Sequence, residues 1–159
     1  MRRREVTGSG CGRGLKVGLA VSQFNATITE ALLDGALGAL EEAEVEDCTI
    51  VRVPGALELG AALLRLCETG HDAVVAIGAV IEGETDHYEH VATQTSNATT
   101  QIGLATGIPI GNAVLTVREI GHARERSLPG PGNKGAEAAL AAITMANTLR
   151  EIQNPEPGT

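Results

Sequence analysis

Short apolar runs alternate along the chain with longer stretches in which apolar residues recur every three or four positions. The short runs have the length and β-branched content of strands and cover residues 15–21, 48–53, 74–80 and 109–115, of which 74–80 has the pattern of a buried strand. The longer stretches predict helices over residues 27–40, 57–67, 89–102, 116–126 and 134–151. Strands that alternate with helices form parallel sheets covered on both faces, so we expect one α/β domain over residues 15–152.

Local signals refine the predicted helix ends. Thr27 with Glu30, and Thr116 with Glu119, match the capping box, in which each side chain accepts a free backbone N–H at a helix start. Gly70 is expected to follow the end of the second helix. The helix over residues 89–102 is rich in Thr, Gln and Asn, so we expect it to face a solvent channel or a partner.

The two ends of the chain lack periodicity. Residues 1–14 are rich in glycine and basic residues and are predicted to be a flexible arm, and residues 153–159 a flexible tail. The basic triplet 2–4 has no apolar run behind it, so we do not expect a signal peptide. No stretch approaches the roughly 20 apolar residues of a membrane span.

Composition narrows the class of protein. The 159 residues are 43% hydrophobic but include one Phe, one Tyr and no Trp, so the core must rely on small aliphatic side chains, and subunit contacts in a homo-oligomer are expected to supply further burial. A net charge of −8 argues against a nucleic-acid or anionic-membrane partner. Three cysteines without C-x-x-C spacing predict reduced thiols in a cytoplasmic protein.

Polar residues crowd the end of the third predicted strand, where open α/β sheets bind ligands. His87 has three open interpretations: a proton carrier, a metal ligand together with His90, or a solvated residue at a helix start. The metal interpretation is weak because the spacing is not that of a zinc-binding helix. The segment 83–85 is either an anion cradle of backbone N–H groups, with the Glu84 side chain turned away, or an ordinary solvated turn.

Further candidates lie near other predicted strand ends. Phe24 follows the first strand and either stacks on a flat heterocycle or plugs the first helix. Glu58 follows the second strand and either favours the helix dipole or holds a polyhydroxyl chain. With His87 and Asn112, these residues are expected to converge at the carboxyl ends of the strands.

A glycine-rich segment precedes the last helix. Residues 130–135 match G-x-G-x-x-G, but no strand and no βαβ unit accompany them, so we reject a dinucleotide site. Lys134 stands at a helix start, a disfavoured place for a cation, which suggests a ligand or partner role.

Several segments in this order resemble the lumazine synthase family. They are Ser22-Gln-Phe-Asn25, Val53-Pro-Gly-Ala-Leu-Glu58, Gly78-Ala-Val-Ile-Glu-Gly-Glu-Thr-Asp-His87, Gly107-Ile-Pro-Ile110, Val114-Leu-Thr116 and Gly132-Asn-Lys-Gly-Ala-Glu-Ala-Ala139. They span about residues 15–150, and together they are far more specific than any single motif above.

The resemblance implies a fold and an activity. The fold is a flavodoxin-like three-layer α/β/α sandwich with a four-stranded parallel sheet, assembled as pentamers or as 60-subunit capsids with active sites between subunits. The reaction condenses 5-amino-6-(D-ribitylamino)uracil with 3,4-dihydroxy-2-butanone 4-phosphate to 6,7-dimethyl-8-ribityllumazine, phosphate and water, the penultimate step of riboflavin biosynthesis. It requires no metal and no organic cofactor. Riboflavin synthase is a further candidate partner.

The resemblance also implies roles for individual residues. His87 would shuttle protons. The pyrimidine and ribityl groups would contact Phe24, Asn25, Ala56, Leu57, Glu58, Val80, Ile81, Asn112 and Lys134. The phosphate would bind Gly83, Glu84, Thr85 and Arg126. Asn112, Arg126 and Lys134 would approach from a neighbouring subunit.

Three residues depart from the family's commoner pattern. Leu57 replaces an aromatic residue, Glu82 replaces Arg or Lys, and Asn112 replaces Phe. Glu82 and Asn112 favour an alternative function, a non-catalytic flavin- or lumazine-binding or shell-forming homologue. Pro129 and Pro131 stiffen a loop whose length is that of capsid-forming members, so pentamer and capsid both remain expectations.

Overall fold

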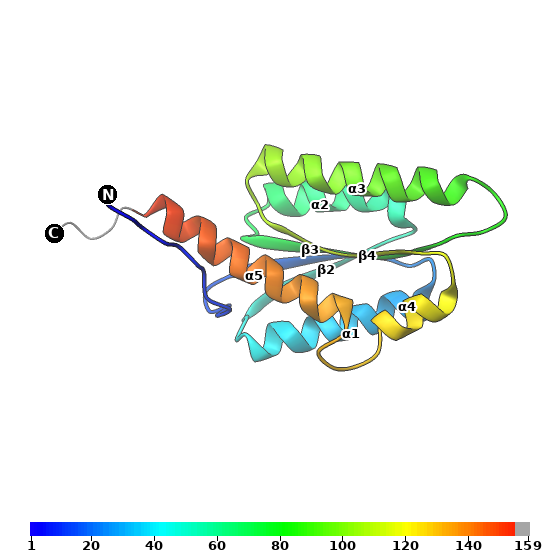
Figure 1. The fold of residues 1–159 in the computed structure, drawn as a ribbon, viewed down its shortest axis with the longest axis horizontal. Coiled ribbons are helices and arrows are strands. Elements are labelled where there is room, and N and C mark those ends of the chain that lie inside the picture. The colour runs from blue at the N-terminus through cyan, green and yellow to red at the C-terminus, as the bar shows by residue number, and fades with distance from the viewer. Residues whose placement is uncertain (155–159) are drawn as a thin grey trace.

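The computed structural model describes residues 1–154 and shows a sheet between two layers of helices (Figure 1). The strands are β1 (Lys16–Ser22), β2 (Asp47–Val53), β3 (Ala73–Ile81) and β4 (Ile110–Val117). The helices are α1 (Ala26–Glu42), α2 (Leu59–Glu68), α3 (His87–Thr106), α4 (Ile120–Arg126) and α5 (Lys134–Gln153), with a 3₁₀ turn η1 (Ala56–Glu58) before α2. The expected α/β/α sandwich is confirmed.

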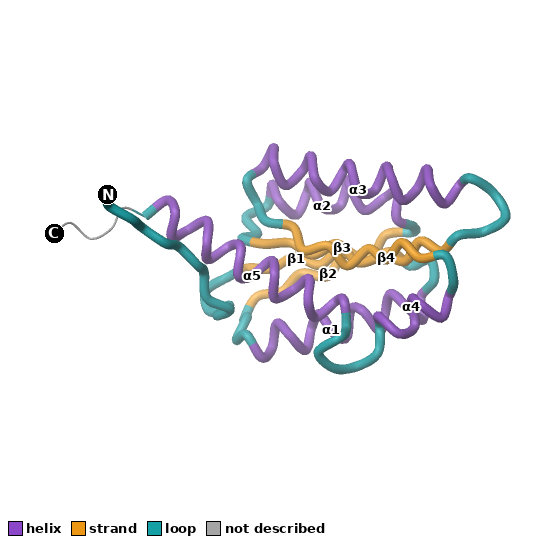
Figure 2. Tube along the Cα trace, in the orientation of Figure 1, coloured by secondary structure: helices purple, strands orange, loops and turns teal. Residues whose placement is uncertain are grey.

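All four strands run parallel in the order β2-β1-β3-β4, as the expected parallel sheet requires (Figure 2). The chain moves outward from β1 to β2 and then returns across β1 to β3. The direction of winding therefore reverses between β1 and β3. In open α/β sheets, ligands bind outside the carboxyl ends of the strands at such a reversal.

Side chains of β3 alternate between two separate cores. Val75 and Ile77 pack with the layer of α1, α4 and α5, whereas Val74 and Ala76 pack with the layer of α2 and α3 (Figure 1). All four residues are fully buried. Burial on both faces explains why this strand reads as an uninterrupted apolar run rather than as an alternating one.

Small residues allow the layers to approach closely. A β-carbon at Gly111 would overlap the Ala138 carbonyl of α5, and one at Gly135 would overlap the Leu32 carbonyl of α1. The chain thus compensates for its shortage of aromatic volume by bringing backbones together, as the composition led us to expect.

Two predicted capping boxes are wrong. Helix α1 begins at Ala26, so Thr27 lies inside its first turn, and no side chain caps this helix. Thr116 belongs to β4, because pairing with β3 continues to Val117 and outweighs the local motif. No side chain caps α4 either.

Most boundaries lie within a few residues of their predicted positions. The helix expected from residue 57 instead begins as η1 and continues as α2. Helix α3 is longer than predicted at both ends. Gly70 follows α2 with a φ of 85°, which is the conformation expected of a residue just past a helix end.

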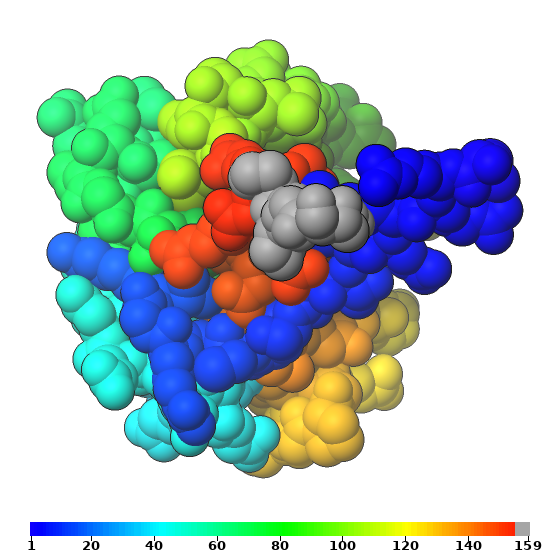
Figure 3. Space-filling view, turned by 90° about the vertical axis from the view of Figure 1, so that its left-hand side faces the viewer, coloured from blue at the N-terminus to red at the C-terminus, as the bar shows by residue number. Residues whose placement is uncertain are grey.

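Residues 1–14 form no helix or strand but contact α5. The Gly8 N–H donates to Thr148 Oγ1 over 3.0 Å, and the Asn147 amide donates to the Ser9 and Cys11 carbonyls over 2.8 Å each. Figure 3 shows this segment crossing the end of the molecule beside the last turns of α5. The flexibility of residues 1–14 remains a prediction. Of the tail expected over residues 153–159, Gln153 still belongs to α5, and residues 155–159 lie outside the described part of the chain.

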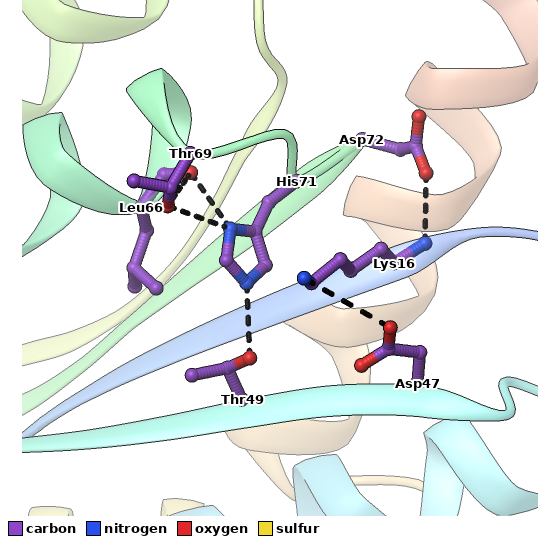
Figure 4. Close-up of polar contacts among 7 residues, drawn as sticks. All are labelled: Lys16, Asp47, Thr49, Leu66, Thr69, His71 and Asp72. Carbon is purple, nitrogen blue, oxygen red and sulfur yellow. Dashed lines mark hydrogen bonds and ion pairs between the residues drawn. The ribbon is translucent and has the colours of Figure 1, made fainter.

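A buried histidine joins elements at the amino ends of the strands (Figure 4). His71 Nδ1 contacts the Leu66 carbonyl of α2 over 2.8 Å, and Nε2 contacts Thr49 Oγ1 of β2 over 3.0 Å. A carbonyl only accepts, so Nδ1 carries a proton in this contact. The contacts hold α2, β2 and the start of β3 together at the end opposite the strand carboxyl ends.

The three cysteines are free thiols. Desolvation by burial raises the pKa of Cys67, with a smaller opposing effect of a Thr106 hydrogen bond. Desolvation and then the Asp47 carboxylate raise the pKa of Cys48. Both effects favour the neutral, less nucleophilic thiol.

Within residues 1–154, no helix combines the length and apolar character that crossing a bilayer requires.

We predict that Asn133→Ala lowers the free energy of unfolding by about 2–4 kcal/mol. The Asn133 side chain is buried, caps α5 by accepting from the Gly135 and Ala136 N–H groups, and donates to the Ala31 and Ser127 carbonyls. Urea unfolding at fixed protein concentration measures the effect, and Asn133→Asp should retain the cap but lose the donated bonds. A loss below about 0.5 kcal/mol for Asn133→Ala would contradict this role.

Thr27→Ala should change the free energy of unfolding by less than about 0.5 kcal/mol, since Thr27 is exposed and caps nothing. The same urea titration checks it. A loss of about 1 kcal/mol in the free energy of unfolding would instead indicate that Thr27 caps α1, as the sequence suggested.

Candidate active site

A cavity of about 470 Å³ opens at the carboxyl ends of β1, β2 and β3, where the winding of the sheet reverses. In Figure 1 these strand ends lie at the right, opposite the two termini. The predicted site residues in its lining are Phe24, Asn25, Ala56, Leu57, Glu58, Val80, Ile81, Gly83, Thr85 and His87. The fold therefore brings together segments more than 60 residues apart.

Phe24 presents a bare aromatic ring to this cavity. Its side chain is 72% exposed, and its backbone N–H donates to the Pro54 carbonyl over 3.1 Å. This bond, with one from Gln23 to Val53, ties the loop after β1 to the end of β2. An exposed ring on a cavity wall does not plug a helix, so the arrangement favours stacking on a flat ligand.

Asn25 shapes the cavity through its backbone. It adopts φ 60° and ψ 48°, a left-handed conformation that turns the chain from β1 into α1. Its side-chain amide donates to the Ala79 carbonyl at the end of β3 over 2.9 Å. The amide therefore links the two strands that flank the reversal, and Asn is one of the few residues that adopts this conformation readily.

Glu58 ends η1 on another wall. Its carboxylate is exposed and, within residues 1–154, has no ion-pair partner. Thr95 of α3 steadies this turn by donating to the Ala56 carbonyl over 3.3 Å from a buried position. A carboxylate held on a fixed turn is available to accept hydrogen bonds from hydroxyl groups.

The start of α3 forms the third wall. Thr85 and His87 line the cavity, and the His87 N–H donates to Thr85 Oγ1 over 3.4 Å. The N-cap residue Asp86 contributes no capping side chain to this 20-residue helix, so the N–H groups that follow that of His87 in the first turn remain available to an anion. Glu84 lies outside the lining, as the anion-cradle interpretation requires.

No group of three or more His, Cys, Asp or Glu residues that could hold a metal ion occurs in the described part of the chain. The pairing of His87 with His90 as metal ligands therefore gains no support.

Comparison with known proteins identifies the family. Residues 14–150 match the family described as 6,7-dimethyl-8-ribityllumazine synthase. A curated protein from Anaeromyxobacter sp. (strain Fw109-5), named 6,7-dimethyl-8-ribityllumazine synthase, is 46% identical over 154 residues, which cover 94% of each chain. The chain belongs to the lumazine synthase family. The expected family is thus confirmed, and with it the expectations of a flavodoxin-like fold and of an enzyme.

Besides Glu84, three residues that the resemblance to lumazine synthases assigns to the site lie outside this cavity. Asn112 is the third residue of β4, opposite Ala76, so its expected position at a strand end is wrong. Arg126 ends α4 and donates to the His122 carbonyl over 3.0 Å. Lys134 forms an ion pair with Glu137 over 2.7 Å, which by itself offsets the unfavourable charge at its helix start.

Five further residues line the cavity without having been predicted as site residues: Pro54, Gly55 and Ala79, and in α3 the pair Tyr88 and Val91. Both follow His87 within the first turns of α3, and Val91 is placed four residues after it, on the same helix face. Helical spacing from His87 is the signal that could have found them.

We predict that Asn25→Ala lowers the free energy of unfolding by about 2 kcal/mol and Asn25→Gly by about 1 kcal/mol. Both lose the bond to Ala79, but Gly tolerates the positive φ and Ala does not. Urea unfolding of the two variants side by side is the measurement. Equal losses would contradict a conformational role for Asn25.

Proposed function

We propose that this lumazine synthase homologue condenses 5-amino-6-(D-ribitylamino)uracil with 3,4-dihydroxy-2-butanone 4-phosphate to give 6,7-dimethyl-8-ribityllumazine, phosphate and water. The observation that carries the proposal is the convergence of Phe24, Glu58, Thr85 and His87 on one cavity in a chain of this family. Their chemistry suits a flat heterocycle, a polyhydroxyl chain, a phosphate and a proton transfer.

The cavity divides between the two substrates. Phe24 stacks on the pyrimidine ring, and Glu58 accepts hydrogen bonds from ribityl hydroxyls. Backbone groups of Ala56, Val80 and Ile81 contact the ring edge. This arrangement places the 5-amino group of the pyrimidine toward the start of α3.

The phosphate ester lies at the start of α3. Backbone N–H groups of residues 83–85 and the Thr85 hydroxyl bind its oxygens, aided by the positive end of the helix dipole. Anchoring the phosphate holds the neighbouring ketone beside the amine, and this positioning lowers the entropic part of the barrier.

His87 moves protons between the bound substrates. The 5-amino nitrogen attacks the ketone carbon, and loss of water leaves an imine. Removal of the proton from the hydroxyl-bearing carbon then expels phosphate and leaves an enol, which tautomerises to a ketone. The ribitylamino nitrogen attacks this ketone carbon and closes the second ring with loss of water. His87 takes up the proton in the elimination and returns it to a leaving oxygen.

We further propose that adjacent subunits of a pentamer complete the site. In this arrangement Asn112, Arg126 and Lys134 of one subunit approach the cavity of the next. Exposed apolar side chains beside a 550 Å³ hollow between α3, β4 and α5 support such a contact, among them Leu104, which is 82% exposed, and Met145.

Mixing the purified protein with both substrates should produce lumazine absorbance well above the rate of the spontaneous condensation. Equal rates with and without protein would refute the proposed function. Tight riboflavin binding without product would instead support the non-catalytic alternative.

His87→Ala should lower kcat by about 10- to 100-fold without abolishing turnover, because positioning of the substrates persists. His90→Ala is the matched control, since His90 is exposed on the same helix but does not line the cavity. Its kcat should stay within about twofold of the parent protein. Complete loss of activity in a folded His87→Ala protein, or equal losses in the two variants, would contradict this role.

A further inference from the structure

Three carboxylates surround the proposed phosphate position. Glu82, Glu84 and Asp86 alternate with the residues that line the cavity there, and all three are exposed. A phosphate dianion would be repelled by each of them. A cation beside this stretch, in addition to the Arg126 proposed from a neighbouring subunit, would therefore favour phosphate binding.

Sheet register supplies one cation from the neighbouring strand. Ile81 and Val117 are paired at the ends of β3 and β4, and the Glu82 N–H donates to the Val117 carbonyl over 2.9 Å. Glu82 and Arg118 thus follow directly after the paired strand ends. Arg118 Nε lies 3.6 Å from Glu82 Oε2.

Of the three carboxylates, only that of Glu82 has an ion-pair partner within residues 1–154. Within residues 1–154, neither Glu84 nor Asp86 has an ion-pair partner, and Glu82 is the only one that Arg118 has. The Glu82 side chain lies outside the cavity lining, although Ile81 and Gly83 on either side are within it. The carboxylate is therefore directed toward β4 and not toward the phosphate position.

We propose that Arg118 is a positioning residue for phosphate binding, acting through Glu82. It neutralises the Glu82 carboxylate and holds it on the β4 side, so that the N–H groups of residues 83–85 face the dianion with one negative charge fewer nearby. The inference rests on the proposed function, because it assumes that phosphate binds at residues 83–85. Arg118 itself does not touch the substrate.

The solvent exposure of Arg118 and Glu82 distinguishes an electrostatic role of this ion pair from a role in stabilising the fold. The Arg118 side chain is 84% exposed and that of Glu82 44% exposed. Ion pairs of this kind contribute little to stability. Removing Arg118 should therefore change the local potential and leave the fold intact.

The test is a double-mutant cycle on the KM of the phosphate-bearing substrate. Arg118→Ala should raise this KM about two- to fivefold, with kcat and the KM of the pyrimidine unchanged. Glu82→Gln should lower the KM or leave it unchanged, and the double variant should match Glu82→Gln alone. Arg118→Lys should restore the parent value, and about 1 M salt should abolish the differences.

Arg65→Ala is the matched control. Arg65 Nε pairs with Glu68 Oε2 over 3.9 Å on α2, and its side chain is 81% exposed and outside the cavity. Its KM values should equal those of the parent protein. Urea midpoints of all variants should also agree, since none removes a buried contact.

Several outcomes would overturn the inference. An unchanged KM in Arg118→Ala would do so, and so would a double variant as weak as Arg118→Ala, which would mean that Arg118 contacts the substrate directly. If the parent protein forms no lumazine, the proposed function fails. Titration with inorganic phosphate then tests the role of Arg118 separately, and the dissociation constants of the variants should rank in the same order as the KM values predicted above. Absence of phosphate binding to the parent protein would overturn both.

Discussion

The hydrogen bond from the Asn25 amide to the Ala79 carbonyl is the contact on which the cavity depends. It joins the residue that leaves β1 to the strand whose end leads into residues 83–87. A residue in the left-handed conformation is required there, because the chain must turn into α1 without covering the end of β3. The Asn25 amide donates a hydrogen bond to the Ala79 carbonyl, which would otherwise need a hydrogen bond from solvent. Phe24 and the start of α3 keep their relative positions as a result.

The remaining walls follow from parallel pairing. Because β1 and β3 are adjacent, the turn after β1, the turn η1 and the start of α3 reach the same edge of the sheet. Each wall contributes one kind of interaction: an aromatic face, a carboxylate, and the N–H groups of a helix start. The pairing of β3 with β4 brings Arg118 beside Glu82. The electrostatic potential at the proposed anion position therefore also depends on the register of these strands.

The pattern of short β-rich runs between helical stretches was sufficient to predict every strand and a sheet covered on both faces. The signal is strongest for β3, a continuous apolar run, and weakest for β2, most of which is exposed or half-buried. Short motifs were less dependable. The capping box predicted at Thr116 was wrong because pairing of β4 with β3 stabilises the chain there more than one helix cap would. Asn112 was misplaced although the strand predicted over residues 109–115 already continued beyond it, close to the observed end at Val117. The pair of Glu82 with Arg118 joins residues 36 positions apart, and only register brings them together.

The starts of α5 and α3 differ in how their positive helix ends are neutralised. Lys134 looked misplaced beside the positive end of α5, which favoured a ligand. Its ion pair with Glu137 and the buried cap at Asn133 account for the position locally. At α3 the situation is reversed, because neither a capping side chain nor a cation occupies the helix start. A helix start without a capping side chain, in a cavity wall next to an exposed aromatic ring, favours an anionic ligand, and this supports the phosphate position proposed at residues 83–85.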